Sequence, residues 1–122
     1  MNKYQAIDAF FNSFDIPAYE ENSIKKDAVM PYITYSLVTS ELSETGVAMS
    51  CNVWYKSNTW TGINAKTEEI SKKLQGGAKL KTDDGAVILY RGTPFSQNIP
   101  KDNADSTVKG KYINIIADYI IF

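Results

Sequence analysis

The amino-acid sequence predicts a single α+β domain over residues 1–122, with a mostly antiparallel sheet of about five strands packed against two helices. Three observations support this prediction. Two segments carry apolar residues at spacings of three and four, which is typical of amphipathic helices. Several other segments alternate apolar and polar residues, as half-buried strands do. Glycine-rich and aspartate-rich turns separate them, in the order α-β-β-α-β-β-β.

The first predicted helix covers Tyr4 to Phe14, and Pro17 prevents its continuation because the residue before a proline is driven towards extended geometry. The second follows Ser57-Asn58-Thr59, which offers candidate N-cap side chains, and it ends at Gly76-Gly77. The apolar faces of these helices are Tyr4, Ile7, Phe10, Phe11 and Phe14 in the first, and Trp60, Ile63, Ile70 and Leu74 in the second.

Strands are predicted over 32–39, 47–56, 78–82, 86–91 and 111–122, with a further short extended piece around Ala18-Tyr19. The first two should pair as an antiparallel hairpin across the turn Glu41–Gly46. The next two should form a hairpin around Asp83-Asp84-Gly85, which is a strong turn signal. A 16-residue polar loop, Gly92–Thr107, is expected before the last strand, and loops of that length are usually functional.

The composition excludes several classes of function. The chain has 13 basic and 14 acidic residues, so it lacks the basic excess of a dedicated nucleic-acid binder. It contains no histidine, which excludes Ser-His-Asp and Cys-His catalysis and histidine-bound metals. No phosphate-binding or dinucleotide-binding glycine motif is present, so no cofactor is expected. No apolar run is long enough to span a membrane, and we expect a soluble protein.

The remaining chemistry rests on Cys51 and on three pairs of carboxylates. Cys51 lies on the apolar side of its predicted strand and is expected to be a core thiol rather than a nucleophile. The carboxylates could in principle serve acid–base or calcium roles, but turn and loop positions explain them more simply. The pairs are Glu41 with Glu44, Asp83 with Asp84, and Asp102 with Asp105. We therefore expect no enzymatic activity, although a carboxylate-only enzyme is kept as an alternative.

Residues suited to an interface are easier to find. Trp54 falls on the polar side of its strand, where it either covers the core from outside or meets a neighbour. Arg91 is the only arginine beside 12 lysines, and is expected either on the plain surface, which we favour, or in a bidentate pair with a carboxylate. The outward side of the last strand carries Ile116, Ile120 and Phe122, which need a cover that a partner subunit or the N-terminal segment would supply.

The layout of the chain resembles that of tail terminator (tail-completion) subunits of long-tailed bacteriophages. The resemblance covers nearly the whole chain and is carried by order rather than by one diagnostic motif. Its parts are the helix Tyr4 to Phe14, the strings Ile16-Pro17-Ala18-Tyr19 and Met30-Pro31-Tyr32-Ile33-Thr34-Tyr35, a strand ending in Trp54, a helix with a Gly-Gly break, the turn Arg91-Gly92-Thr93-Pro94-Phe95, a polar loop and a long apolar last strand.

The resemblance implies a structural virion protein, made in the host bacterial cytoplasm. Such subunits form a hexameric ring that caps the tail tube and joins it to the head connector, with DNA passing through as cargo. It places contacts with these partners at the Glu41–Gly46 turn and the Gly92–Thr107 loop, which contains Pro94, Phe95, Asp102 and Asp105. The alternatives are another neck protein of the same particle, such as a head-completion or stopper subunit, and a monomeric module that binds a peptide or small ligand on its sheet.

Overall fold

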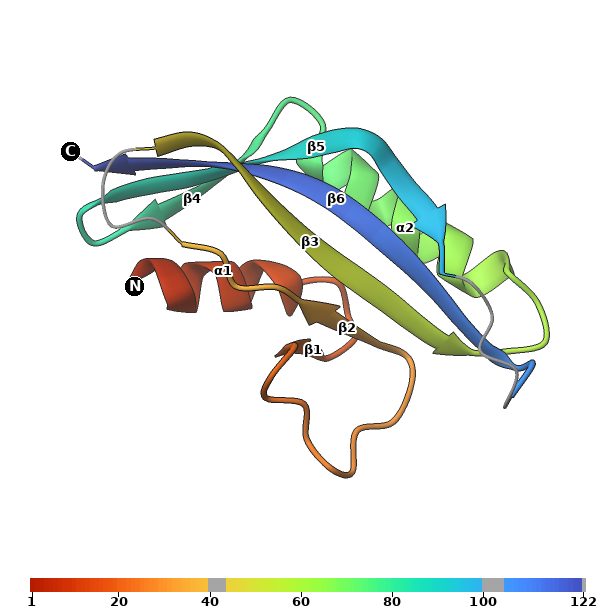
Figure 1. Cartoon of the computed structure of the whole chain (residues 1–122). Coiled ribbons are helices and arrows are strands. Elements are labelled where there is room, and N and C mark those ends of the chain that lie inside the picture. Colours follow the sequence, from red (N-terminus) through yellow and green to blue (C-terminus); the bar gives the residue numbers. More distant parts are fainter. Residues whose placement is uncertain (40–43, 100–104, 122) are drawn as a thin grey trace.

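The computed structural model describes residues 1–39, 44–99 and 105–121, in which two helices pack on a six-stranded mixed sheet (Figure 1). The order of strands across the sheet is β1-β2-β3-β6-β5-β4. The elements are α1 (Lys3–Phe11), β1 (Ala18–Glu20), β2 (Tyr32–Tyr35), β3 (Glu44–Lys56), α2 (Thr61–Leu74), β4 (Ala78–Thr82), β5 (Gly85–Asn98) and β6 (Val108–Ile121).

All neighbouring strands are antiparallel except β1 and β2, which run parallel. Both predicted hairpin pairings are confirmed: β2 pairs with β3, and β4 pairs with β5 across the two residues Asp83 and Asp84. The sixth strand is β1, at the site where only a short extended piece was expected. Its three residues are too few to show a periodicity in the sequence.

Several predicted boundaries are wrong. The prediction ended a strand at Arg91 and placed a loop over Gly92–Thr107, but β5 continues to Asn98 and β6 begins at Val108. Pairing of β5 with β6 is interrupted only between Arg91 and Ser96, where four residues of β5 oppose one of β6, so that three extra residues bulge out of the ladder. The strand predicted over 32–39 ends at Tyr35, and the strand predicted over 47–56 begins at Glu44.

Helix α1 begins with a reciprocal cap. The Gln5 backbone N–H donates to Asn2 Oδ1 at 2.9 Å, and the Asn2 N–H donates to Gln5 Oε1 at 3.0 Å. The helix ends at Phe11 rather than Phe14, although Phe14 is still buried just beyond it. Tyr4 was expected on the buried face, but its side chain is 48% exposed.

Helix α2 begins without a side-chain cap. Trp60 occupies the N-cap position, so the predicted capping by Ser57, Asn58 or Thr59 is wrong. Ser57 instead accepts a hydrogen bond from the Thr59 N–H in the preceding turn. Lys66 Nζ donates to the carbonyl oxygen of Phe14 at 2.6 Å, which ties α2 to the chain that follows α1.

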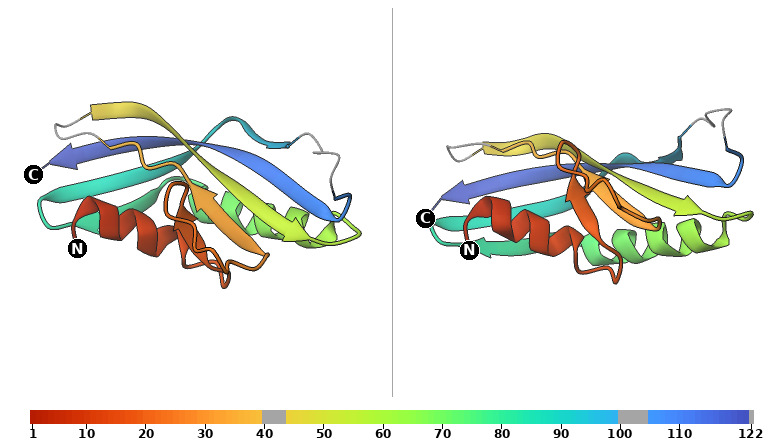
Figure 2. Two further views of the ribbon diagram at one scale, coloured as in Figure 1. Left: turned by 60° about the horizontal axis from the view of Figure 1, so that its bottom comes forward. Right: turned by 90° about the horizontal axis from the view of Figure 1, so that it is seen from below.

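Both helices lie on the same side of the sheet, and the two views of Figure 2 agree on this. The core fills the space between them and the inner sheet face. The aromatic ring of Phe11 stacks on that of Tyr35 at 4.7 Å, and the Tyr35 hydroxyl donates to Asp8 Oδ1 at 2.7 Å. The expected inner row of β6 is buried at Ile113, Ile115, Ala117 and Tyr119, whereas Ile121 at its end is 43% exposed. The opposite face of the sheet carries no helix in the described chain.

Candidate interaction surface

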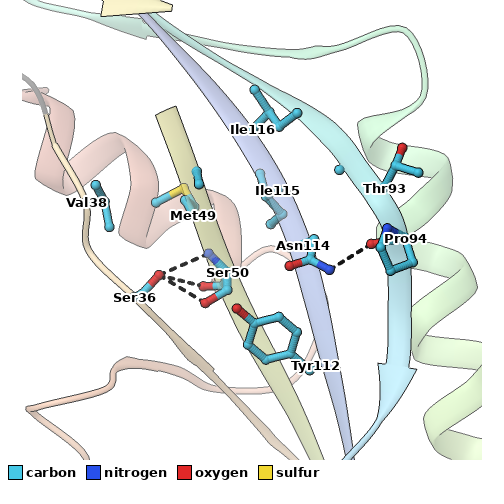
Figure 3. Close-up of a pocket in the computed structure, with 12 residues that line it drawn as sticks. Ser36, Val38, Met49, Ser50, Thr93, Pro94, Tyr112, Asn114, Ile115 and Ile116 are labelled. Carbon is cyan, nitrogen blue, oxygen red and sulfur yellow. Dashed lines mark hydrogen bonds between the residues drawn. The ribbon is translucent and has the colours of Figure 1, made fainter. Parts of the chain in front are cut away.

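The outer, helix-free face of the sheet contains a groove of about 560 Å³ (Figure 3). The paired strands β3 and β6 form its floor, where Ala48 lies opposite Ile116 and Ser50 lies opposite Asn114. None of the residues that line it carries a formal charge at neutral pH. They are Ser36, Val38, Ala48, Met49, Ser50, Gly92, Thr93, Pro94, Tyr112, Asn114, Ile115 and Ile116. The groove therefore offers aliphatic, hydroxyl and amide groups to a partner.

The bulge of β5 forms one wall of the groove, as Figure 3 shows. The four residues from Gly92 to Phe95 stand opposite the single residue Asn114 of β6. Asn114 Nδ2 donates to the carbonyl oxygen of Pro94 at 2.8 Å, which holds the bulge against β6. Gly92 lets the two backbones approach, since a Cβ there would lie 2.9 Å from the Cβ of Asn114.

The chain beyond β2 forms the opposite wall. Ser36 is fixed to β3 at Ser50: its N–H donates to the Ser50 carbonyl at 2.9 Å, and its Oγ accepts from the Ser50 N–H at 3.0 Å. The carbonyl oxygen of Val38 accepts a hydrogen bond from the Tyr119 hydroxyl, while its side chain is 39% exposed at the rim. Both walls are thus held by specific hydrogen bonds to the sheet.

Ile116 and Ile120 were selected from the sequence as interface residues, and the structure places both on the outer face of β6. Ile116 lies in the groove with 37% of its surface exposed. Ile120 is half-buried opposite Ala86 of β5, beside a small cavity of about 30 Å³ near the β4–β5 turn. The two residues therefore share a face but not a site.

Trp54 also lies on the outer face, opposite Tyr32 of β2 and Gly110 of β6. Its indole N–H donates to Thr34 Oγ1 at 3.1 Å, and its ring packs on Gly110, where a Cβ would lie only 2.7 Å from Cζ3. The residue is half-buried, so it covers the outer face of its own sheet. Whether it also meets a neighbour stays a prediction.

Arg91, Pro94 and Phe95 separate in the structure although they are close in sequence. Arg91 is exposed and its Nη1 donates to Ser71 Oγ of α2 at 3.2 Å, on the helix side of the sheet. Pro94 is exposed in the groove wall. Phe95 packs partly buried against the core. Only Pro94 of the three lies in the groove.

Asp105 serves a local structural purpose. Its Oδ1 accepts hydrogen bonds from the N–H and the hydroxyl of Thr107 at 2.9 and 2.6 Å, and Lys56 Nζ lies 3.8 Å from Oδ2. The hydrogen bonds from Thr107 hold the pKa of this carboxyl below its ordinary value, with a smaller contribution from Lys56. Asp102, predicted as its partner in a contact loop, lies outside the described residues.

The expectation that Cys51 is a core thiol is confirmed. Its side chain is 1% exposed, and burial raises the pKa of the thiol to about 12. Burial likewise raises the pKa of the Tyr119 hydroxyl to about 12. Both groups are neutral at physiological pH, and neither faces the groove.

Sequence reasoning missed several groove residues, chiefly Ser36, Val38, Tyr112 and Asn114. Tyr112 and Asn114 carried a usable signal, because they alternate with the buried residues of β6 and must point outward. Thr93 belongs to the Gly92–Thr107 segment that was expected to contact partners, but its place in the groove wall depends on a bulge that the sequence does not mark.

No group of three or more acidic or cysteine side chains in ranges 1–39, 44–99 and 105–121 is placed to hold a metal ion. No helix in those ranges is both long and apolar enough to cross a membrane. Comparison of the chain with family models, with curated proteins and with solved structures gave no match.

Proposed function

We propose that this protein is a structural subunit of a bacteriophage neck: a tail terminator that forms a hexameric ring, caps the tail tube and joins it to the head connector. In this proposal DNA passes through the ring as cargo and the subunit resides in the virion. The observation that carries the proposal is the outer face of the sheet, which no helix covers in the described chain and which holds an uncharged, partly apolar groove.

The chemistry of that face suits contact between proteins. Isolated exposed apolar residues are ordinary on a protein surface, but here Ile116, Val38 and Pro94 surround one groove. Interface cores are depleted in charged residues, and the groove has none. A head-to-tail ring joins this patch to a different patch on the next subunit, and it closes when the rotation between subunits permits.

A second function is supported by the same groove. A monomeric module could bind an extended peptide across β3 and β6, with Asn114 and Ser50 offering polar contacts and Ile116 an apolar one. The other neck proteins of a phage particle are also ring formers, so the first experiment separates ring from monomer rather than one neck protein from another.

The test is the mass of the purified protein in solution, measured by multi-angle light scattering over a range of concentrations. A terminator ring would give about 82 kDa, six times the 13.6 kDa of one chain. Replacing Ile116 by Asp should abolish the ring, because a carboxylate would be buried unpaired in the interface. The monomer should remain folded, with stability changed by less than about 1 kcal/mol, because Ile116 is already 37% exposed.

The matched control is Val29→Asp, which puts the same charge on a residue that is 78% exposed in the connection between β1 and β2. This variant should assemble like the wild type. If Ile116→Asp also assembles normally, the outer face is not the subunit interface. A protein that stays monomeric at every concentration would favour the peptide-binding module.

A further inference from the structure

A second groove, of about 310 Å³, lies on the helix side of the molecule. Unlike the groove on the outer face, it has charged residues in its lining. It is bounded by α1, the last turn of α2 and the edge strand β4. Five of its eight lining residues are apolar and two are lysines. These residues are Met1, Ala6, Ala9, Phe10, Ser13, Lys73, Leu80 and Lys81.

Small side chains create this hollow. Ala6 and Ala9 are three positions apart on α1 and so lie on neighbouring positions of one face. Leu80 of β4 and the buried residue Phe10 line the groove beside them. An apolar side chain from outside could therefore rest on α1 without displacing a residue of the core.

The charged residues that line the groove, Lys73 and Lys81, are both basic. The segment from Ile70 to Thr82 contains four lysines and no acidic residue, within a chain whose net charge is −1. All four are exposed, and none takes part in an ion pair with another described residue. They are Lys72 and Lys73 at the end of α2, and Lys79 and Lys81 on β4.

Two carboxylates close in sequence to these lysines are paired with other cations. Asp83 lies at the β4–β5 turn, where its Oδ1 is engaged by the N-terminal amine at 2.7 Å. Glu69, on the preceding turn of α2, is paired with Lys66 at 3.1 Å. Lys73 and Lys81, which take part in no ion pair with a described residue, therefore place positive charge beside an apolar floor, which is complementary to a ligand with negative charges around an apolar group.

The combination of an apolar floor with lysines distinguishes between possible ligands. A nucleic-acid backbone would use the lysines but has no aliphatic side chain to fill the floor. A purely apolar segment would use the floor and leave the lysines unpaired. A peptide that carries an apolar residue flanked by acidic ones satisfies both, in the manner of a side-chain anchor surrounded by a charged rim.

We propose that the groove between α1, the end of α2 and β4 binds a short acidic segment of a partner protein, which places one aliphatic or aromatic side chain on the Ala6–Ala9 floor. This inference does not depend on the ring. The proposed peptide site lies on the face opposite to the uncharged groove. Such a site is compatible with a neck subunit and with a monomeric module.

The experiment uses the ¹⁵N-labelled full chain and a synthetic ten-residue peptide of Glu and Asp with one central Leu. Backbone amide shifts followed by NMR at low salt should change at Ala6, Ala9 and Leu80 with saturable binding. A peptide with Ser in place of Leu should bind about tenfold more weakly, because it loses the apolar anchor. The double variant Lys73→Glu, Lys81→Glu should lower the affinity for the Leu peptide by about tenfold or more.

The matched control is the double variant Lys25→Glu, Lys26→Glu, which makes the same change of charge on exposed lysines in the connection between β1 and β2. It should bind the Leu peptide nearly as the wild type does. Raising the salt to about 0.5 M should weaken binding without moving the affected amides, because exposed charges are screened.

Several results would overturn the proposal. Amide shifts centred elsewhere would show that the groove is not the site. Equal affinity for the Leu peptide, the Ser peptide and a DNA duplex would show a polyanion surface without an apolar anchor. The same amides shifting with protein concentration alone would identify a second copy as the occupant. By contrast, a Lys73→Glu, Lys81→Glu protein that loses the peptide but keeps its mass in light scattering would support the proposal and separate this site from the ring.

Discussion

The replacement Gly85→Ala tests how closely β5 and β6 are fitted at the β4–β5 turn. Gly85 is buried at the start of β5 and is paired with Ile121. A Cβ at this position would lie 1.7 Å from the carbonyl oxygen of Ile120 and 2.9 Å from the Cα of Ile121. These are backbone atoms of the neighbouring strand, so no side-chain rotation can relieve the overlap.

The size of the destabilisation by Gly85→Ala follows from the separation between strands that the added methyl group needs. Close carbon–oxygen contacts between strands lie at about 3.3 Å, so β6 must move away by roughly 1.6 Å. That shift breaks about two ladder hydrogen bonds, each contributing about 1 kcal/mol. It also disturbs buried neighbours such as Val87 and Tyr119, for which overpacking costs about 1–3 kcal/mol. We expect a loss of about 3–5 kcal/mol in the free energy of unfolding, or roughly 12–20 °C in Tm.

Urea denaturation followed by circular dichroism measures this loss, and two other glycines supply controls. Gly62→Ala lies in α2 and meets only the ring of Tyr55 at 3.1 Å, so helix propensity should make it neutral or slightly stabilising. Gly76→Ala has open space but a φ of +77°, and should cost about 1–2 kcal/mol. A Gly85→Ala protein that loses less than Gly76→Ala would refute the close fit of β5 on β6.

Two further predictions concern ionisable groups. Cys51 should react with a thiol reagent at pH 8 only as fast as the protein unfolds, because the thiol is buried and its pKa is raised to about 12; stoichiometric labelling of the folded protein within seconds would contradict this. Asp105 has a lowered pKa, so its contribution to stability is present above the ordinary aspartate pKa and is lost as the pH falls through the lowered one. Thr107→Val removes one hydrogen bond to Asp105 and should raise that pKa in an NMR titration, and an unchanged midpoint would contradict the assignment.

The periodic elements could be predicted from the sequence because burial alone determines their pattern. The face of α2 marked by Ile63, Ile70 and Leu74 is buried as expected, and Cys51 falls on the inner side of β3. Ile116 points outward because it alternates with Ile115 in β6. In each case the helical or strand periodicity alone predicts which face of the element a residue occupies. No contact with a distant part of the chain has to be known.

The errors arose where a long-range contact overrides a local signal. Glycine and proline in Gly92-Thr93-Pro94 are typical of a loop, yet pairing with β6 resumes at Ser96 because the bulge absorbs the extra residues. The same bulge builds one wall of the groove, so the groove could not be predicted either. The short strand β1 exists only through its parallel register with Ile33 to Tyr35, which no local pattern reveals.

The position of β6 has a consequence for how the chain reaches this fold. The sheet has two halves, β1-β2-β3 and β5-β4, and β6 lies between them although it is the last strand in sequence (Figure 1). Its partners on β3 are distant along the chain: Lys56 pairs with Val108, and Glu44 pairs with Tyr119. Contacts of such long range slow folding, since the connecting chain must be ordered before they form. During synthesis both half-sheets therefore keep an unpaired edge until β6, which follows them in the chain, has left the ribosome and joins them.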